Sequence, residues 1–222
     1  MKANWWKILA VVLVLYAIVG GMLMKAPELP ILHETIRNLH YHVTMWFTMM
    51  SLMTASVVYS IKYLSGFELK NDIKAKAFAE VGMLAGVLGL TTGSLWAKFT
   101  WGAFWVSDPK LNGAAITALI YLAYFILRNS LDDDQKRART AAVYNIFAFV
   151  ILVVFLMILP RMPGIDSLHP GNGGNAPFSD LEVDNELRKV FYPAMLGWIL
   201  LGFWIAQIRF RLGKIEYQLN NK

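Results

Sequence analysis

The sequence predicts an all-α membrane protein, a single bundle of six transmembrane helices. Of its 222 residues, 57% are hydrophobic and only 16% are charged, and the apolar residues gather in six runs. Each run is close to the roughly 20 residues that cross a hydrocarbon core of about 30 Å, and the backbone there must be helical because no water can bond its amide groups. The linkers leave no room for a soluble domain, so we expect residues 1–222 to form one polytopic domain. The expected spans are 5–24, 43–64, 77–95, 113–128, 140–159 and 190–208.

The first run has lysines on its N-terminal flank, as a secretory signal does. We expect it to be retained as a span, because no small-x-small cleavage site follows it and the pair Trp5 and Trp6 is typical of an interface anchor. The fourth run is the shortest and begins shortly after Pro109. Before the sixth run, Ser179 and Glu182 form a capping box, which predicts that the last helix begins there.

The basic residues predict the orientation of the bundle. When the chain is divided at the six spans, 14 of the 21 Lys and Arg residues fall on one side, which the positive-inside tendency assigns to the cytoplasm. Both termini are then cytoplasmic, and the loops at about 25–42, 96–112 and 160–189 face outward. The net charge of +6 therefore reflects topology and a solvated cytoplasmic rim, and it gives no basis for binding nucleic acid.

An aromatic-rich loop separates the third and fourth spans. Tryptophan rings offer a flat apolar area with a polar edge, which suits either the lipid headgroup level or a flat ligand such as a porphyrin. Trp101, Trp105 and Asp108 are spaced at i, i+4 and i+7, so they would share one face of a helix, although Pro109 limits its length. The alternative is an interfacial helix that these tryptophans merely anchor.

All four histidines fall in the other two outward loops. Neutral imidazole is a good axial ligand for haem iron, and two rings from different loops would hold the metal from opposite faces. His42 lies one turn before Trp46 at the outer edge of the second span, and His169 opens the glycine-rich run HPGNGGNAPF, which is typical of a mobile connection. For His33 and His40, a solvated or interface position is the simpler interpretation. The chain has no cysteine, so a bound haem would be of b type, without a thioether link.

The segment TGSLWAKFTWGAFWVSDPKLN, residues 92–112, resembles the tryptophan-rich signature of haem-handling proteins of cytochrome c biogenesis, most closely the six-span cytochrome c maturation protein C family. The matching residues are Thr92, Gly93, Ser94, Trp96, Lys98, Trp101, Gly102, Trp105, Asp108 and Leu111. Ser107 stands where that family usually has a third tryptophan, and Asn112 replaces the usual threonine. The tryptophan pair that often precedes the last-loop histidine is missing.

Two further matches extend the resemblance over most of the chain. One is the approach to the second span, where Arg37 lies five residues before His42, and the other is Leu168, His169 and Gly171 in the last outer loop. The resemblance implies that the chain presents haem at the outer face of the bacterial inner membrane and delivers it to a periplasmic haem chaperone. It also implies association with a membrane-bound ATP-binding cassette transporter and a small single-span partner.

We therefore expect a haem-binding and haem-delivery protein rather than an enzyme, since no nucleophile and base pair or phosphate loop is evident. His42 and His169 are the expected axial ligands, the segment from Trp96 through Trp101 and Trp105 to Asp108 is the expected porphyrin platform, and Arg37 is a candidate partner for a propionate.

Two alternatives come from other classes of protein. A cytochrome b-like electron carrier also uses paired histidines, but these usually face each other from within spans. A secondary transporter of a small hydrophobic substrate is expected to hold charges near the midplane, and the expected span centres have none.

Overall fold

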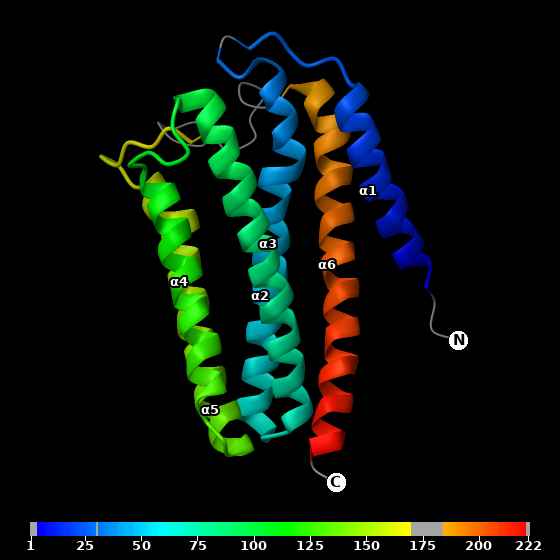
Figure 1. Cartoon of the computed structure of the whole chain (residues 1–222), viewed down its shortest axis with the longest axis vertical. Coiled ribbons are helices and arrows are strands. Elements are labelled where there is room, and N and C mark those ends of the chain that lie inside the picture. Colours follow the sequence, from blue (N-terminus) through cyan, green and yellow to red (C-terminus); the bar gives the residue numbers. More distant parts are fainter. Residues whose placement is uncertain (1–3, 30, 170–183, 221–222) are drawn as a thin grey trace.

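The computed structural model describes residues 4–29, 31–169 and 184–220, and nearly all of them are helical (Figure 1). The long helices are α1 (Trp5–Leu23), α2 (Leu39–Gly66), α3 (Leu69–Trp101), α4 (Pro109–Asn129), α5 (Asp134–Val153) and α6 (Asn185–Asn220). A 3-10 turn, η1 (His33–Asn38), leads into α2, while a π-helical turn, η2 (Val154–Ile158), and a 3-10 turn, η3 (Leu159–Arg161), prolong α5.

Six helices in the described part of the chain are long and apolar enough to cross a membrane, which agrees with the predicted number of spans. Several are longer than their apolar runs: α3 has 33 residues and α6 has 36, or roughly 50 Å each at about 1.5 Å per residue. Hydropathy marks only the part of a helix that lies in lipid. The charged but helix-favouring residues at its ends continue the same helix into water.

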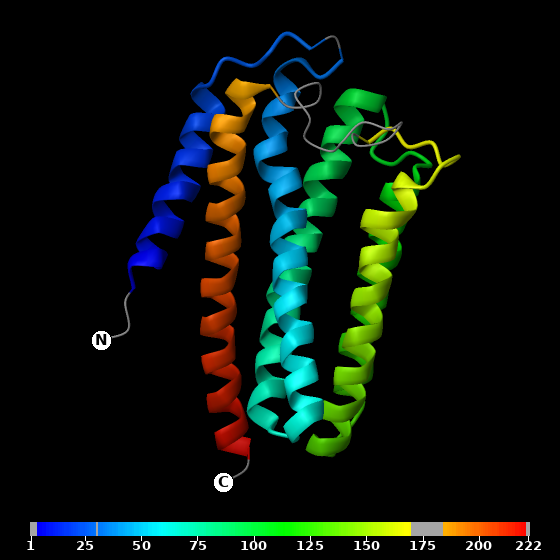
Figure 2. The same ribbon diagram turned by 180° about the vertical axis from the view of Figure 1, so that it is seen from behind.

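The helices form three neighbouring groups (Figures 1 and 2). The antiparallel pair of α2 and α3 lies in the middle, with α6 and then α1 on one side and the α4–α5 hairpin on the other. The described parts of the three long connections, residues 24–29 and 31–38, 102–108 and 162–169, lie at one end of the bundle, which we call the loop end. The short connections at 67–68 and 130–133 and the C-terminal end of α6 lie at the opposite, turn end.

Small residues along α3 allow the close packing of α2. Bulky α2 side chains fill positions where a Cβ on α3 would approach to between 2.3 and 3.0 Å. Following α3 toward the loop end, the pairs are Gly82 with Met53, Gly86 with Met49, Gly89 with Trp46, and Gly93 with His42. Small residues that let helices approach closely are the usual means of helix association in membranes, where lipid offers no hydrophobic driving force.

One basic residue contradicts the prediction of a uniformly solvated cytoplasmic rim. Arg128, in the last turn of α4, is only 4% exposed and forms a bidentate ion pair with Asp72 in the first turn of α3. A guanidinium is tolerated in such a place because a carboxylate matches its planar fork. The pair fastens the α4–α5 hairpin to the centre of the bundle at the turn end.

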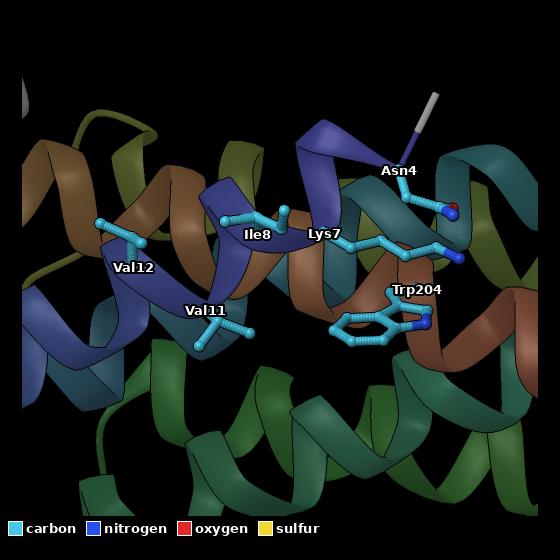
Figure 3. Close-up of a pocket in the computed structure, with 6 residues that line it drawn as sticks. All are labelled: Asn4, Lys7, Ile8, Val11, Val12 and Trp204. Atoms are coloured by element: carbon cyan, nitrogen blue, oxygen red, sulfur yellow. The ribbon is translucent and has the colours of Figure 1, made fainter. Parts of the chain in front are cut away.

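The helices α1 and α6 diverge toward the N-terminus of α1. A Cβ at Gly197 of α6 would lie 2.8 Å from the Cβ of Leu13, so the two helices touch there. Farther toward the N-terminus a groove opens between them, with an apolar wall of α1 side chains facing the indole of Trp204 (Figure 3). This groove lies away from the loop end and its histidines.

Candidate functional site

The aromatic loop is not one helix. α3 ends at Trp101, because Gly102 adopts a left-handed conformation with φ of 81°, and α4 begins only at Pro109. Trp101, Trp105 and Asp108 would share a face only on one continuous helix, so this expectation does not hold here. Glycine at the position after α3 ends that helix, and proline at the first position of α4 begins the next one.

Asp108 organises the loop end instead. It is 1% exposed and caps α4 by accepting hydrogen bonds at Oδ1 from the backbone N–H groups of Lys110 and Leu111, at 2.9 and 3.3 Å. The same carboxylate accepts hydrogen bonds from the segment that follows α5. The Ser167 hydroxyl donates to Oδ2 at 2.8 Å, the Leu168 N–H donates to Oδ2 at 2.7 Å, and His169 Nδ1 lies 3.1 Å from Oδ1.

These donors fix the charge of Asp108. Burial by itself raises the pKa of a carboxyl group, but here the hydrogen bonds from His169, Leu168 and Ser167 outweigh it and hold the pKa of Asp108 well below its ordinary value. The group is therefore an anion at any physiological pH. We call Asp108 together with Ser167, Leu168 and His169 the aspartate clamp.

The clamp determines how His169 can bind a metal. A carboxylate only accepts hydrogen bonds, so the proton of a neutral His169 ring is on Nδ1 and the lone pair is on Nε2. The ring also meets the indole of Trp101 edge to face, with ring centres 5.2 Å apart. This arrangement, an imidazole with a carboxylate behind it, is typical of metal-ligating histidines.

His42 also makes its hydrogen bond through Nδ1, but to a backbone carbonyl. Its Nδ1 lies 2.9 Å from the carbonyl oxygen of Gly89, so the ring donates from Nδ1 and again carries its lone pair on Nε2. Trp46 and Trp96 meet the ring edge to face, with centres 6.4 and 5.8 Å away. His42 is half-buried and sits at the loop end of α2.

Each of the two histidines contacts a tryptophan in the last turns of α3. Trp96 contacts His42, Trp101 contacts His169, and only four residues of α3 lie between the two tryptophans. Thus two of the predicted platform tryptophans lie beside the two predicted ligands.

Trp105, the third predicted platform residue, lies on the exposed part of the loop. It is 44% exposed, and its indole Nε1–H donates to Asn112 Oδ1 at 3.2 Å. Phe104 beside it is 57% exposed and lies under the ammonium group of Lys98, which is 5.7 Å from the ring centre. These rings are available to a membrane surface or to a partner.

Arg37 makes structural contacts at the edge of this region. Its Nη1 donates to the carbonyl oxygens of Gly21 and Met24 at 2.8 and 2.7 Å, which caps the C-terminal end of α1, and the guanidinium pairs with Glu34. Arg37 also lines an open groove whose opposite wall includes Trp96. It is therefore near the site but already engaged with backbone oxygens.

The two remaining histidines differ from each other. His33 is exposed and has a left-handed backbone, with φ of 43°. His40 is fully buried, and its Nε2 lies 3.2 Å from the sulfur of Met24, so the expectation of a solvated or interface position is wrong for it. A ring inside the α1–α2 contact packs like an apolar side chain because its apolar carbons face Gly21.

The capping box predicted at Ser179 and Glu182 lies outside the described residues, as does most of the glycine-rich run after His169. The start of α6 differs from the prediction, because the helix begins at Asn185 and residue 184 is not helical. Asp184 caps it by accepting a hydrogen bond from the N–H of Leu187 at 2.8 Å.

The donors of the aspartate clamp and the glycine contacts of α3 were not predicted from the sequence. The residue types of Ser167 and Leu168 do not indicate that they bind Asp108. A loop serine is common, and Leu168 acts through its backbone N–H. The glycine spacing of α3, in contrast, is visible in the sequence as GMLAGVLGLTTG from residue 82 to residue 93, a small-residue pattern typical of helix packing in membranes.

Comparison with known proteins shows which family the chain resembles. The family model CcmC, described as heme exporter protein C, matches residues 1–219. Similar curated proteins include heme exporter protein C of Bradyrhizobium diazoefficiens, 37% identical over 83 residues, which are 37% of this chain and 32% of the relative. The protein of the same name from Haemophilus influenzae is 29% identical over 139 residues, 61% and 54% of the two chains. That of Escherichia coli K12 is 24% identical over 140 residues, 63% and 54%. The matched part of the chain thus spans about half the length, or less, of these relatives.

Proposed function

The chain belongs to the CcmC (heme exporter protein C) family, and on that premise we propose that it binds haem at the periplasmic face of the bacterial inner membrane and delivers it to a periplasmic haem chaperone. Haem in this scheme is cargo that arrives, is held and leaves. The chain would act as a binding and delivery protein of cytochrome c maturation and not as an enzyme.

The observation that carries the proposal is the common orientation of two imidazoles. His169 donates from Nδ1 to Asp108, and His42 donates from Nδ1 to the Gly89 carbonyl, so both rings carry their lone pair on Nε2. Axial ligation of haem needs such a lone pair on each side of the porphyrin, whose own nitrogens supply the other four ligands. The donor set fits haem without any further protein ligand.

The aromatic residues support the same proposal. Trp96 and Trp101 contact the two rings and would present apolar surface beside the porphyrin, while Trp105 lies farther out on the exposed loop. The binding would be non-covalent, because the chain has no cysteine. Nη1 of Arg37 is engaged by two backbone oxygens, so a propionate would have to compete with Glu34 for the other side of the guanidinium.

The two ligands are held differently, which suits a carrier. His42 is part of the long helix α2, whereas His169 lies in a non-helical segment attached through the clamp. Hydrogen bonds of this kind each contribute only about 1–3 kcal/mol to stability, so withdrawal of His169 is the easier route to release. Haem would then remain on His42 until the acceptor's own ligand replaces His169.

Orientation and partners follow from charge and exposure. Most of the basic residues belong to the turn end, which by the positive-inside tendency faces the cytoplasm and leaves the loop end in the periplasm. The exposed rings of Phe104 and Trp105 are the part of the loop that we expect to meet the chaperone. The transporter and the small single-span protein that the family resemblance implies would associate with the bundle in the membrane.

The alternatives are less well supported. A cytochrome b-like carrier holds both histidines rigidly within spans, but His169 lies outside the described helices. For a transporter, the buried charges of interest would be Asp72 and Arg128, and these neutralise each other near the turn end.

The test of the proposal is haem retention and transfer. Purified His42→Ala and His169→Ala proteins should each retain less haem, and His169→Ala should also change the rate of transfer to the chaperone. His33→Ala is the matched control because its side chain is exposed. Normal haem content and normal transfer in both test variants would reject the ligand assignment.

A further inference from the structure

We infer that Gly93 is a positioning residue for haem ligation: the missing side chain at this position allows Nδ1 of His42 to reach the Gly89 carbonyl, which leaves Nε2 as the nitrogen that would ligate haem. The inference rests on the proposed function, because it takes His42 to be a ligand. It concerns a residue that faces the ring of His42.

Among the described glycines, Gly93 is the one at which an added Cβ would come nearest to another atom. A Cβ on Gly93 would lie 2.3 Å from Cε1 and 2.8 Å from Nδ1 of His42, distances that real Cβ atoms essentially never show. At Gly82 and Gly86 the neighbour is the end of a flexible methionine side chain, which can move aside. At Gly93 the neighbour is a rigid ring.

The ring has little freedom to move. Trp46 and Trp96 meet it nearly at right angles, with interplanar angles of 81° and 78°. Trp96 is itself fixed, because its Nε1–H donates to Thr35 Oγ1 at 3.0 Å. A methyl group at position 93 would therefore displace the ring from its hydrogen bond.

The backbone around Gly93 is also fixed relative to α2. Asn38, which directly precedes α2, donates from Nδ2 to the carbonyl oxygen of Thr92 at 2.9 Å. The same turn of α3 thus supplies an acceptor to Asn38, an acceptor to His42 through Gly89, and the space for the ring. α3 thus holds the imidazole of His42 in one orientation. Loss of the group that orients a metal-ligating histidine typically weakens metal affinity by about 10- to 100-fold.

The experiment compares wild type, Gly93→Ala, His42→Ala and Gly82→Ala, each purified and titrated with haemin. Gly82→Ala is the matched control, since it adds a methyl group to the same helix contact but against the flexible Met53. We expect Gly93→Ala to bind haem about 10- to 100-fold more weakly, with the low-spin absorption of two histidine ligands replaced by a high-spin spectrum. Added imidazole should restore the low-spin form in both Gly93→Ala and His42→Ala, and Gly82→Ala should resemble wild type.

The outcomes separate the inference from the proposed function. If His42→Ala loses the low-spin form and Gly93→Ala keeps it at wild-type affinity, His42 is a ligand but Gly93 does not position it. If His42→Ala keeps the wild-type spectrum, the ligand assignment itself fails and the inference falls with it.

A measurement on the haem-free wild-type protein needs no variant to fold. Nitrogen-15 NMR of the histidines should show the Nδ1–H tautomer for His42 at neutral pH. The Nε2–H tautomer would contradict the inference.

Discussion

Replacing Asp108 with asparagine should loosen the aspartate clamp while leaving the shape of the side chain unchanged. In the wild type, Oδ1 accepts the two capping N–H groups and His169, and Oδ2 accepts Ser167 and the Leu168 N–H. An asparagine that keeps its oxygen at Oδ1 still caps α4, because asparagine is a favourable capping residue. Its NH₂ group then replaces Oδ2 and faces the Leu168 N–H, donor against donor.

The magnitude follows from the bonds that are lost. The Ser167 hydroxyl can rotate and accept a hydrogen bond, but the Leu168 N–H cannot, and a hydrogen bond to a charged group contributes about 1.5–3 kcal/mol. The bond from His169 also loses its charged acceptor. Since about 1.4 kcal/mol corresponds to a factor of ten, haem affinity should fall roughly 10- to 100-fold.

The assay is haem titration monitored by absorption, with Asp133→Asn as the control. Asp133 caps α5 by accepting a hydrogen bond from the Lys136 N–H at 2.7 Å, so the substitution makes the same chemical change at the turn end. The control should bind haem as the wild type does. Equal affinity in Asp108→Asn and Asp133→Asn would refute the clamp.

The clamp also predicts a pH dependence. The folded-state pKa of Asp108 is depressed, so its stabilising contribution is fully present above the ordinary value of about 3.9 and is lost only as the pH falls toward the lower folded value. In the haem-free protein, the amide of Leu168 should therefore stay protected from hydrogen exchange down to about pH 4. Loss of that protection between pH 7 and pH 5 would show that another group controls the segment.

Three more predictions concern the platform, the turn end and the orientation. Trp101→Ala should weaken haem binding by the loss of ring contact, about 0.5–1.5 kcal/mol beyond area burial, yet leave a low-spin spectrum; loss of that spectrum would make the tryptophan essential for ligation. Arg128→Ala leaves Asp72 buried without its partner and should lower the unfolding free energy by about 3–5 kcal/mol with little change in haem affinity; a drop below 1 kcal/mol in a denaturation assay would contradict the pairing. The chain has no cysteine, so a single introduced cysteine is labelled without background. A cysteine in place of the exposed Ser107 should react with an impermeant thiol reagent from the periplasmic side, and one in place of the exposed Ser130 should not. The reverse pattern would show that the topology is inverted.

The spans were predictable because hydropathy and span length depend on local composition. Helix ends were not, since charged residues continue α3 and α6 beyond the lipid. The aromatic loop shows a second difference. Spacing favoured a shared helical face for Trp101 and Asp108, but the left-handed Gly102 broke the helix between them.

The histidines show what residue type alone can and cannot tell. It predicted His42 and His169 as a pair, and the structure gives both rings the same Nδ1 donor pattern. It could not distinguish the buried His40 from the exposed His33, because burial depends on how η1 and α1 pack. The acceptors of the two rings, a carboxylate 61 residues away and a carbonyl 47 residues away, depend on the tertiary fold.

The most direct test of the central claim, that His42 and His169 ligate haem together, is the coordination state of iron in four proteins. Wild type, both single alanine variants and the double variant would be loaded with haem and compared by electron paramagnetic resonance and absorption. We predict low-spin iron with two nitrogen ligands in the wild type, high-spin iron in each single variant with recovery on added imidazole, and no specific ligation in the double variant. Low-spin iron in the double variant would contradict this prediction.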